Sequence, residues 1–385
     1  MLTRPIRKCC IIGIALACAC AAIANPSPRR AARNVVRDWD YNGKVILGHL
    51  GNDLCEWSAR SGRLLRRLSG HKAPIATVKL SSNGKEAITT SGGFSRWPGP
   101  HPPMTCLWDL AHGRLIKKLD NEGQASFSPD GRRILTGNWA EGKFYAHIGD
   151  ARTGKRLASF PVSAISLAFS YNHKDFLPSN GLAKVVVYDT RTGAAVGKGN
   201  LRYIFDSIST FGPSDPGLIR WGQGGLNITD FKARKAIFQL PDSIDARNYY
   251  VPVAQVSPKG AQILAGSSAG VDVYALHSRR RLRHLSPPSE GPVTSLSVNE
   301  KHVLIQRYAD SNGGPLMGSE WNYRTEKILA RFDGAPVCFS KRGKTFLTCP
   351  VDVKAKQKLS IISAKTGAVI RTINLDKYYP AIKEE

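Results

Sequence analysis

The chain has 385 residues, of which 42% are apolar, so its length and composition exclude a disordered polypeptide. Its 55 Lys and Arg outnumber 29 Asp and Glu, which gives a formal net charge of +26 and predicts attraction to polyanions. The 36 Gly and 23 Pro are spread along the chain and favour many short strands joined by turns.

Residues 1–24 have the features of a targeting segment. Three basic residues are followed by the apolar stretch Cys9–Ala24, which ends in the small residues Ala22 and Ala24. The stretch has 16 residues, fewer than the roughly 20 needed to span a bilayer. We expect a cleaved signal peptide and a secreted or periplasmic protein with no transmembrane span after cleavage. The alternatives are an uncleaved membrane anchor or a lipid attached to Cys18 or Cys20.

A repeated pattern follows this segment. Each copy is an alternating apolar run, a small or polar residue, a short turn and a second run, as in "CLWDLAHGRLIKKL". Eight copies recur with a period near 40 residues, which is typical of a repeat architecture. The copies begin at Cys55, Cys106, Ala146, Val185, Leu226, Val271, Ser319 and Leu359.

A second motif lies between these copies, as in "ASFSPDGRRILTG" from Ala125 and "AQVSPKGAQILAG" from Ala254. Its turn links two more short strands, so each unit has four strands, named a to d in chain order. One such sheet cannot shield both of its faces, whereas sheets stacked around an axis shield one another. We predict an all-β fold, a β-propeller of eight four-stranded blades over residues 33–376, with a linker at 25–32 and a tail at 377–385. The alternative is seven blades plus a divergent extra sheet.

The layout resembles the WD-repeat propeller family, as a divergent, exported member of bacterial type. The best copy has "SGH" ending at His71 and "LWD" ending at Asp109. The resemblance implies that Trp108 packs between blades, that Asp109 closes a turn, and that His71 joins a structural hydrogen-bond network. The usual Asp of the family before strand c is missing in this unit.

Four cysteines remain after cleavage. Cys338 and Cys349 flank a predicted hairpin and form a candidate disulfide, which a slip of one or two residues in register would prevent. Cys55 and Cys106 occupy the same position in two repeats, so we do not expect them to bond with each other.

Motifs that would indicate catalysis are weak. "GSSAG", with Ser268 at its centre, matches a nucleophile pattern but is not followed by a helix, so we interpret it as a hairpin loop. "DSNGG" at Asp310–Gly314 resembles a calcium loop without the later acidic ligands. We expect no catalytic residue, metal or cofactor. The alternative is a lactonase-like or quinone-dehydrogenase-like propeller enzyme with a site at the central channel.

Two surface features suggest binding. The long b–c and d–a connections share one rim and favour a binding face, on which Arg96, Trp97 and His101 are candidate partner contacts. Basic runs on strand d, such as "RLLRRL", either meet an anionic surface or prevent edge aggregation. We predict a monomeric, non-catalytic scaffold for a protein or polyanionic partner, and leave nucleic-acid binding open.

Overall fold

The computed structural model describes the chain from Trp39 to Leu375, together with Tyr378. Gaps longer than three residues cover 93–100, 170–174, 180–183, 201–206, 212–216, 231–234, 240–252, 287–290, 309–315 and 350–357, and shorter gaps occur elsewhere. The predicted targeting segment and linker, Arg96, Trp97, Ser268 and Asp310–Gly314 lie outside the described residues.

The described strands form eight four-stranded sheets, each built from consecutive strands that pair antiparallel. We name these sheets blades 1 to 8. Blade 1 contains β1 (Asp40–Tyr41), β2 (Val45–Leu50), β3 (Asp53–Ser58) and β4 (Leu64–Ser69), and blade 2 contains β5 (Ile75–Leu80), β6 (Glu86–Ser91), β7 (Met104–Asp109) and β8 (Arg114–Asp120). Blade 3 contains β9 (Gln124–Phe127), β10 (Arg133–Ala140), β11 (Lys143–Asp150) and β12 (Arg156–Val162), and blade 4 contains β13 (Ser166–Phe169), β14 (Asp175–Ser179), β15 (Lys184–Asp189) and β16 (Ala195–Asn200).

Blades 5 to 8 contain β17 (Ser207–Phe211), β18 (Gly217–Gly222), β19 (Gly225–Asp230) and β20 (Lys235–Gln239); β21 (Ala254–Val256), β22 (Gln262–Gly266), β23 (Val271–Ala275) and β24 (Arg281–Leu285); β25 (Val293–Val298), β26 (His302–Tyr308), β27 (Leu316–Asn322) and β28 (Lys327–Asp333); β29 (Ala335–Phe339), β30 (Thr345–Cys349), β31 (Lys358–Ser363) and β32 (Val369–Asn374). Among all the residues that the structure describes, no helix is long and apolar enough to cross a bilayer.

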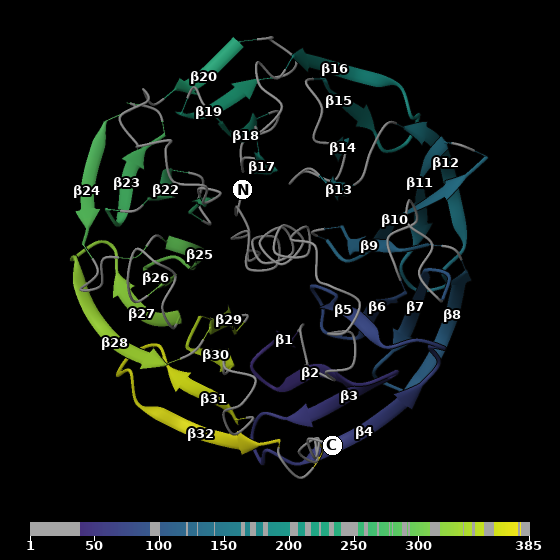
Figure 1. Ribbon diagram of the computed structural model, residues 1–385, viewed down its shortest axis with the longest axis horizontal. Coiled ribbons are helices and arrows are strands. Elements are labelled where there is room, and N and C mark those ends of the chain that lie inside the picture. The colour runs from purple at the N-terminus through teal and green to yellow at the C-terminus, as the bar shows by residue number, and fades with distance from the viewer. Residues whose placement is uncertain are drawn as a thin grey trace, which may run out of the picture.

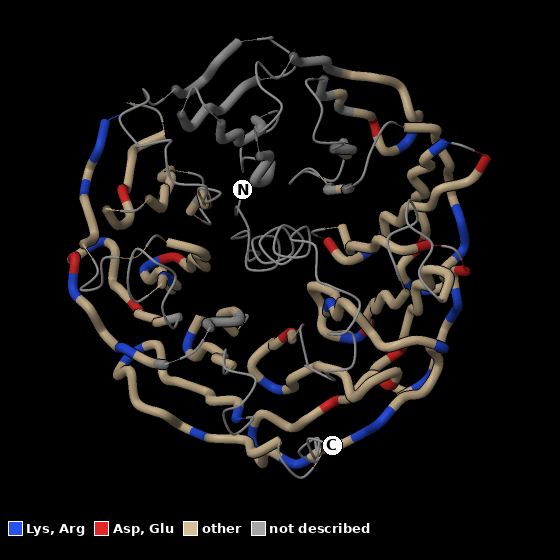
Figure 2. The backbone as a smooth tube through the Cα atoms, in the orientation of Figure 1, with Lys and Arg blue, Asp and Glu red and all other residues tan. Residues whose placement is uncertain are grey.

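The blades are arranged in a ring (Figure 1). Strand a of each blade lies toward the axis and strand d lies at the circumference, where many of the Lys and Arg are also found (Figure 2). Each inner strand contacts the inner strand of the next blade, and β29 contacts β1, so the ring is closed. The prediction of an all-β propeller is therefore confirmed.

Two kinds of turn recur in which a short side chain accepts hydrogen bonds from the turn backbone. In the a–b turns, the hydroxyls of Ser81, Ser128 and Ser340 each accept a hydrogen bond from the amide five residues later. In the c–d turns, Asp109 and Asp150 accept from backbone amides two to three residues later. The motifs seen in the sequence are thus local turn signals.

The outer strand pair of every blade contains an irregularity. The register between strands c and d shifts by one residue in all eight sheets. The extra residue of strand d is aliphatic each time. These bulged residues are Leu65, Ile116, Leu157, Val196, Ile237, Leu282, Leu329 and Ile370.

The antiparallel order gives the ring two different faces. We call the face that carries the a–b and c–d turns the turn face, and the face that carries the b–c and d–a connections the loop face. Turns of neighbouring blades adjoin on the turn face, where Gly84 lies against Asn42, and Gly43 lies against Ser340 of blade 8.

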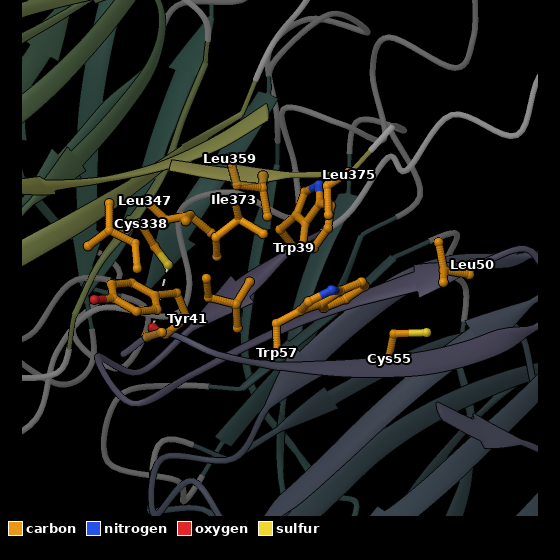
Figure 3. Packing of buried hydrophobic residues seen from close by; sticks show 13 residues of the cluster. Trp39, Tyr41, Leu50, Cys55, Trp57, Cys338, Leu347, Leu359, Ile373 and Leu375 are labelled. Atoms are coloured by element: carbon orange, nitrogen blue, oxygen red, sulfur yellow. Dashed lines mark hydrogen bonds between the residues drawn. The ribbon is translucent and has the colours of Figure 1, made fainter. Parts of the chain in front are cut away.

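The hydrophobic core is divided among the interfaces between blades. Trp108 packs toward blade 1, in a cluster with Leu47 and Leu54. Trp57 packs toward blade 8, in a cluster with Leu347 and Ile373 (Figure 3). We call this last interface, between blades 8 and 1, the seam, because no connecting peptide crosses it.

The proposed Cys338–Cys349 disulfide is not formed, and both residues remain thiols. The pairing register of β29 with β30 places Cys338 opposite Leu347 and Cys349 opposite Ala335. The Cys338 thiol instead points across the seam, where its sulfur lies 3.6 Å from the carbonyl oxygen of Tyr41. That pairing register excludes the bond.

Candidate binding face

A buried hydrogen-bond network lies beneath the loop face of blade 2. His71, in the d–a connection, contacts the Ser91 hydroxyl through Nδ1 and the Thr89 hydroxyl through Nε2, both at 2.6 Å. The Trp108 indole donates to the same Thr89 oxygen at 2.8 Å. The network thus joins the d–a connection to strands b and c.

Burial keeps the His71 ring neutral. The side chain is 8% exposed, and this burial, together with the positive charge of Lys118 and the nearby His49, lowers its pKa to about 4. A neutral imidazole donates from one nitrogen and accepts at the other, which suits two hydroxyl partners. The position of His71 at the end of a fixed network indicates a structural element rather than a proton-transfer group.

Blade 3 has charged groups in the equivalent place. Glu122 follows strand d as His71 does, and Gly149 stands at the position of Trp108 in strand c. Arg156, which pairs with Gly149, reaches the buried Glu122 carboxylate at 2.6 Å. An ion pair thus takes the place of the imidazole and indole of blade 2.

His147 completes this buried cluster. Its Nε2 lies 3.0 Å from the Asn138 oxygen, and its ring stacks on Tyr145. Burial lowers the pKa of His147, an effect that the Glu122 charge opposes and the Arg156 charge reinforces. The cluster fixes the base of the b–c hairpin of blade 3.

That hairpin projects from the loop face. Strand β10 pairs with β9 only as far as Gly137, opposite Gln124, but continues to pair with β11 until Ala140, opposite Lys143. Trp139 lies in this extension, packs against Phe144, and is 38% exposed. An exposed tryptophan on a paired and supported hairpin is suited to anchoring a partner.

The residues predicted from the sequence fall into two groups. His71 and Trp108 are brought together in the buried network, whereas Asp109 lies at the c–d turn, where it bonds the His112 amide and ring and Arg114. His101 is exposed in the b–c connection of blade 2. Trp139 was not predicted, although an aromatic residue at a hairpin tip is a usable signal. Within the described residues, no group of three or more His, Cys, Asp or Glu is arranged to hold a metal.

No protein-family model matches the chain. Among curated proteins, it is similar to a WD-repeat protein, the "Periodic tryptophan protein 2 homolog" of Schizosaccharomyces pombe, with 20% identity over 288 residues. The match covers 62% of this chain and 32% of the relative, so this chain aligns with about a third of that protein.

Solved structures share the fold at low identity. Dihydro-heme d1 dehydrogenase NirN aligns with a TM-score of 0.64, 14% identity, and coverage of 92% of this chain and 76% of NirN. A eukaryotic initiation factor aligns with a TM-score of 0.58 and 14% identity, and the alignment covers 92% of this chain and 91% of the factor. Sqt1 of Saccharomyces cerevisiae aligns with a TM-score of 0.59 and 14% identity, and the alignment covers 89% of this chain and 96% of Sqt1. The fold is thus shared with a dehydrogenase, an initiation factor and Sqt1.

Proposed function

We propose that the protein is a non-catalytic scaffold that binds a protein partner through the loop face of blades 2 and 3. The observation that carries this proposal is the exposed Trp139 on the projecting β10–β11 hairpin. The likeness to WD-repeat and other propeller proteins supports a scaffold in general terms.

The surroundings of Trp139 favour a rigid contact surface. Its hairpin rests on the Glu122–Arg156 ion pair and the His147–Asn138 hydrogen bond. A preorganised side chain loses less conformational entropy on binding than a mobile one. His101 belongs to the same face in the neighbouring blade and adds a polar contact beside this anchor.

The test is affinity purification from the exported fraction with wild-type protein and Trp139→Ala. We expect the wild type to recover the same partner at low and high salt, and Trp139→Ala to bind it at least tenfold more weakly, as for an interface anchor worth about 2 kcal/mol. The matched control is Leu282→Ala, an exposed apolar residue on outer strand β24. Undiminished partner binding by Trp139→Ala would contradict the proposal.

We also propose that the protein is exported, with cleavage after Ala24, and acts as a monomeric ring. This proposal rests on the basic and apolar segment at the start of the sequence. N-terminal sequencing of the exported protein should begin at Asn25. An intact Met1, or a lipid on Cys18 or Cys20, would instead identify an anchored protein.

The alternative proposal is an enzyme with its site at the central channel, which the likeness to NirN keeps open. That likeness concerns the fold alone at 14% identity. The alternative predicts that a tetrapyrrole added to the protein binds stoichiometrically and shifts its absorbance maximum. A titration without saturation would favour the scaffold.

A further inference from the structure

Several cations of the outer strands are matched by carboxylates. On β4, Arg67 lies 2.6 Å from Asp53. On β12, Arg156 lies 2.6 Å from Glu122, and on β24, Arg281 lies 3.5 Å from Asp272. These pairs make the circumference less positive than its sequence predicts, and the rest of the surface contributes to the net charge of the chain.

The turn face is where cations recur without such partners. The residue immediately before strand b is Lys or Arg in five blades, and it is exposed each time. These residues are Lys44, Lys85, Arg132, Lys301 and Lys344. Among the ion pairs of the described residues, none involves these five side chains. Since neighbouring a–b turns adjoin, the five cations lie on an inner arc that runs from blade 7 through blades 8, 1 and 2 to blade 3.

A second set lies farther from the axis, in the c–d turns of the same face. The set consists of the exposed Arg60, Arg152, Arg191, Arg324 and Lys365. The carboxylates of these turns, such as Asp150, accept backbone hydrogen bonds and remain charged, so they offset part but not all of this positive charge. Two concentric sets of cations thus share one face.

The described part of the loop face has no comparable excess. Its exposed charges include Lys72, Lys143 and Lys358 on one side and Asp120 and Glu141 on the other. The asymmetry between the faces therefore has a definite sign, with the positive potential concentrated at the regular turns rather than at the long loops.

Exposed aliphatic side chains border this cationic face. The bulged residues Leu65, Leu157, Val196, Leu282 and Ile370 each stand three positions after the c–d turn residue, and their exposed fractions lie between 37% and 56%. A basic residue adjoins each of them except Val196, and Figure 2 shows Lys and Arg on the outer strands. A bulged residue has no opposite partner in the ladder, so its side chain is available for other contacts.

We propose that the turn face docks on the surface of an anionic lipid bilayer. The inner and outer cations spread over the turn face of six of the eight blades, from blade 7 through blades 8, 1, 2 and 3 to blade 4, which matches a flat sheet of anionic headgroups better than a narrow nucleic-acid duplex. Aliphatic side chains at the border gain free energy in the headgroup region, whereas a nucleic acid or acidic polysaccharide offers them no apolar phase. The docking leaves the loop face available to the partner proposed above and does not depend on it.

The test is sedimentation with phosphatidylcholine vesicles that contain either no anionic lipid or about 30% phosphatidylglycerol. The ring is contained within residues 39–375, so the chain from Asn25 is used and the apolar N-terminal segment plays no part. We expect binding to anionic vesicles only. The variant Lys44→Gln, Lys85→Gln, Lys344→Gln should bind about 100-fold more weakly, since each basic residue near such a surface contributes about fivefold.

The matched control removes the same number of charges from the loop face with Lys72→Gln, Lys143→Gln, Lys358→Gln, and it should change vesicle binding less than threefold. Equal losses in the two triple variants would show a non-specific effect of net charge and overturn the proposal. Unchanged binding by the turn-face variant would also overturn it.

A third variant separates a bilayer from other polyanions. Leu65→Ser, Leu157→Ser, Ile370→Ser should weaken vesicle binding and leave binding to duplex DNA and heparin unchanged. If DNA or heparin binds as tightly as the vesicles and the serine variant binds vesicles normally, the partner is a soluble polyanion and the lipid proposal is wrong. Trp139→Ala should retain vesicle binding, so failure of the partner proposal is distinguishable from failure of this one.

Discussion

At the scale of a single residue, His71 makes the stability of the fold depend on pH. Its pKa is about 4 in the folded chain, whereas an unfolded histidine titrates near 6.5. Between these values the unfolded state binds more protons than the folded state, so stability is lost as the pH falls. The hydrogen bonds of the ring are retained only while it is neutral.

We therefore expect His71→Gln to flatten the pH dependence of stability. At pH 7.5 the variant should lose about 1 kcal/mol, because its amide replaces the ring contacts imperfectly. At pH 4.5 the difference should vanish or change sign, since the wild type must then protonate His71 on unfolding. Urea unfolding at the two pH values measures the effect, and a constant difference would contradict this assignment of the titrating group.

Glu320 affects the pH dependence of stability in the opposite direction to His71. Its side chain is fully buried between strands, 3.0 Å from His302 Nδ1, and burial raises its pKa although the hydrogen bond to His302 lowers it. A raised carboxyl pKa means that the folded state holds the proton above the pH at which the unfolded state has lost it. Stability is therefore lost as the pH rises from the unfolded value through the folded one.

Glu320→Gln should remove this loss. At pH 4 the variant and the wild type should be equally stable, because both carry a neutral group. At pH 8 the variant should be more stable, by about 1.4 kcal/mol for each unit by which the folded pKa exceeds the unfolded one. Thermal or urea unfolding at both pH values checks the sign, and a variant that is less stable at pH 8 would show that the charged pair with His302 stabilises the fold.

At this scale, sequence reasoning succeeded where the signal is local. The positions of His71 and Trp108 follow from a repeat and need no knowledge of the rest of the chain. The Cys338–Cys349 pairing failed because it depends on the pairing register of β29 with β30, which the sequence does not reveal. Trp139 was missed because its exposure depends on how far β10 extends beyond β9, which is a tertiary property.

At the scale of elements, the turns are the part of the fold that the sequence predicts best. Glu326 occupies the c–d turn position of blade 7 with a φ of 60°, a left-handed conformation that disfavours a side chain. Gly367 holds the equivalent place in blade 8 with a φ of 68°. Gly51 has a φ of 61° in a b–c turn, with open space around it.

These positions separate backbone strain from steric contact. Gly51→Ala should cost about 1 kcal/mol, because only the left-handed backbone opposes it. Gly367→Ala should cost more, since a Cβ there would lie 2.6 Å from the Leu329 carbonyl oxygen, a backbone atom that cannot move aside. Urea unfolding compares the two variants, and equal losses would mean that the contact in blade 8 relaxes.

The charged turns and the bulges show why the rest of the surface was not predicted. In the sequence, Lys85 or Lys344 is one basic residue in a polar turn. Only the closed ring gathers these residues on one face, opposite the loops that the sequence emphasised. The bulges likewise follow from the pairing register of strands c and d, although their aliphatic residues recur visibly in the repeats.

At the scale of the whole molecule, the ring closes without sharing a strand between its ends. Contacts across the seam include the Trp57 cluster and a 2.8 Å hydrogen bond between Tyr41 and Thr345. Asp40 bonds the Leu80 amide in blade 2 and approaches Cys338 in blade 8, and its burial raises its pKa. Packing and hydrogen bonds therefore hold blades 8 and 1 together without a d–a connection, whereas the other neighbouring blades are also joined by such a connection.

Opening the ring at the seam breaks no chain connection, whereas separating any other two neighbouring blades is limited by the d–a peptide that joins them. We therefore expect Trp57→Ala to cost about 3–5 kcal/mol and to increase amide hydrogen exchange selectively in β1 and β29. Trp321→Ala is the matched control, because Trp321 packs between blades 6 and 7 in a similar cluster. It should lower the free energy of unfolding by a comparable amount but leave exchange at its interface closer to that of the wild type, since the blades remain tethered. Equal local exchange at the two interfaces would show that the connecting peptides contribute little to holding the ring closed.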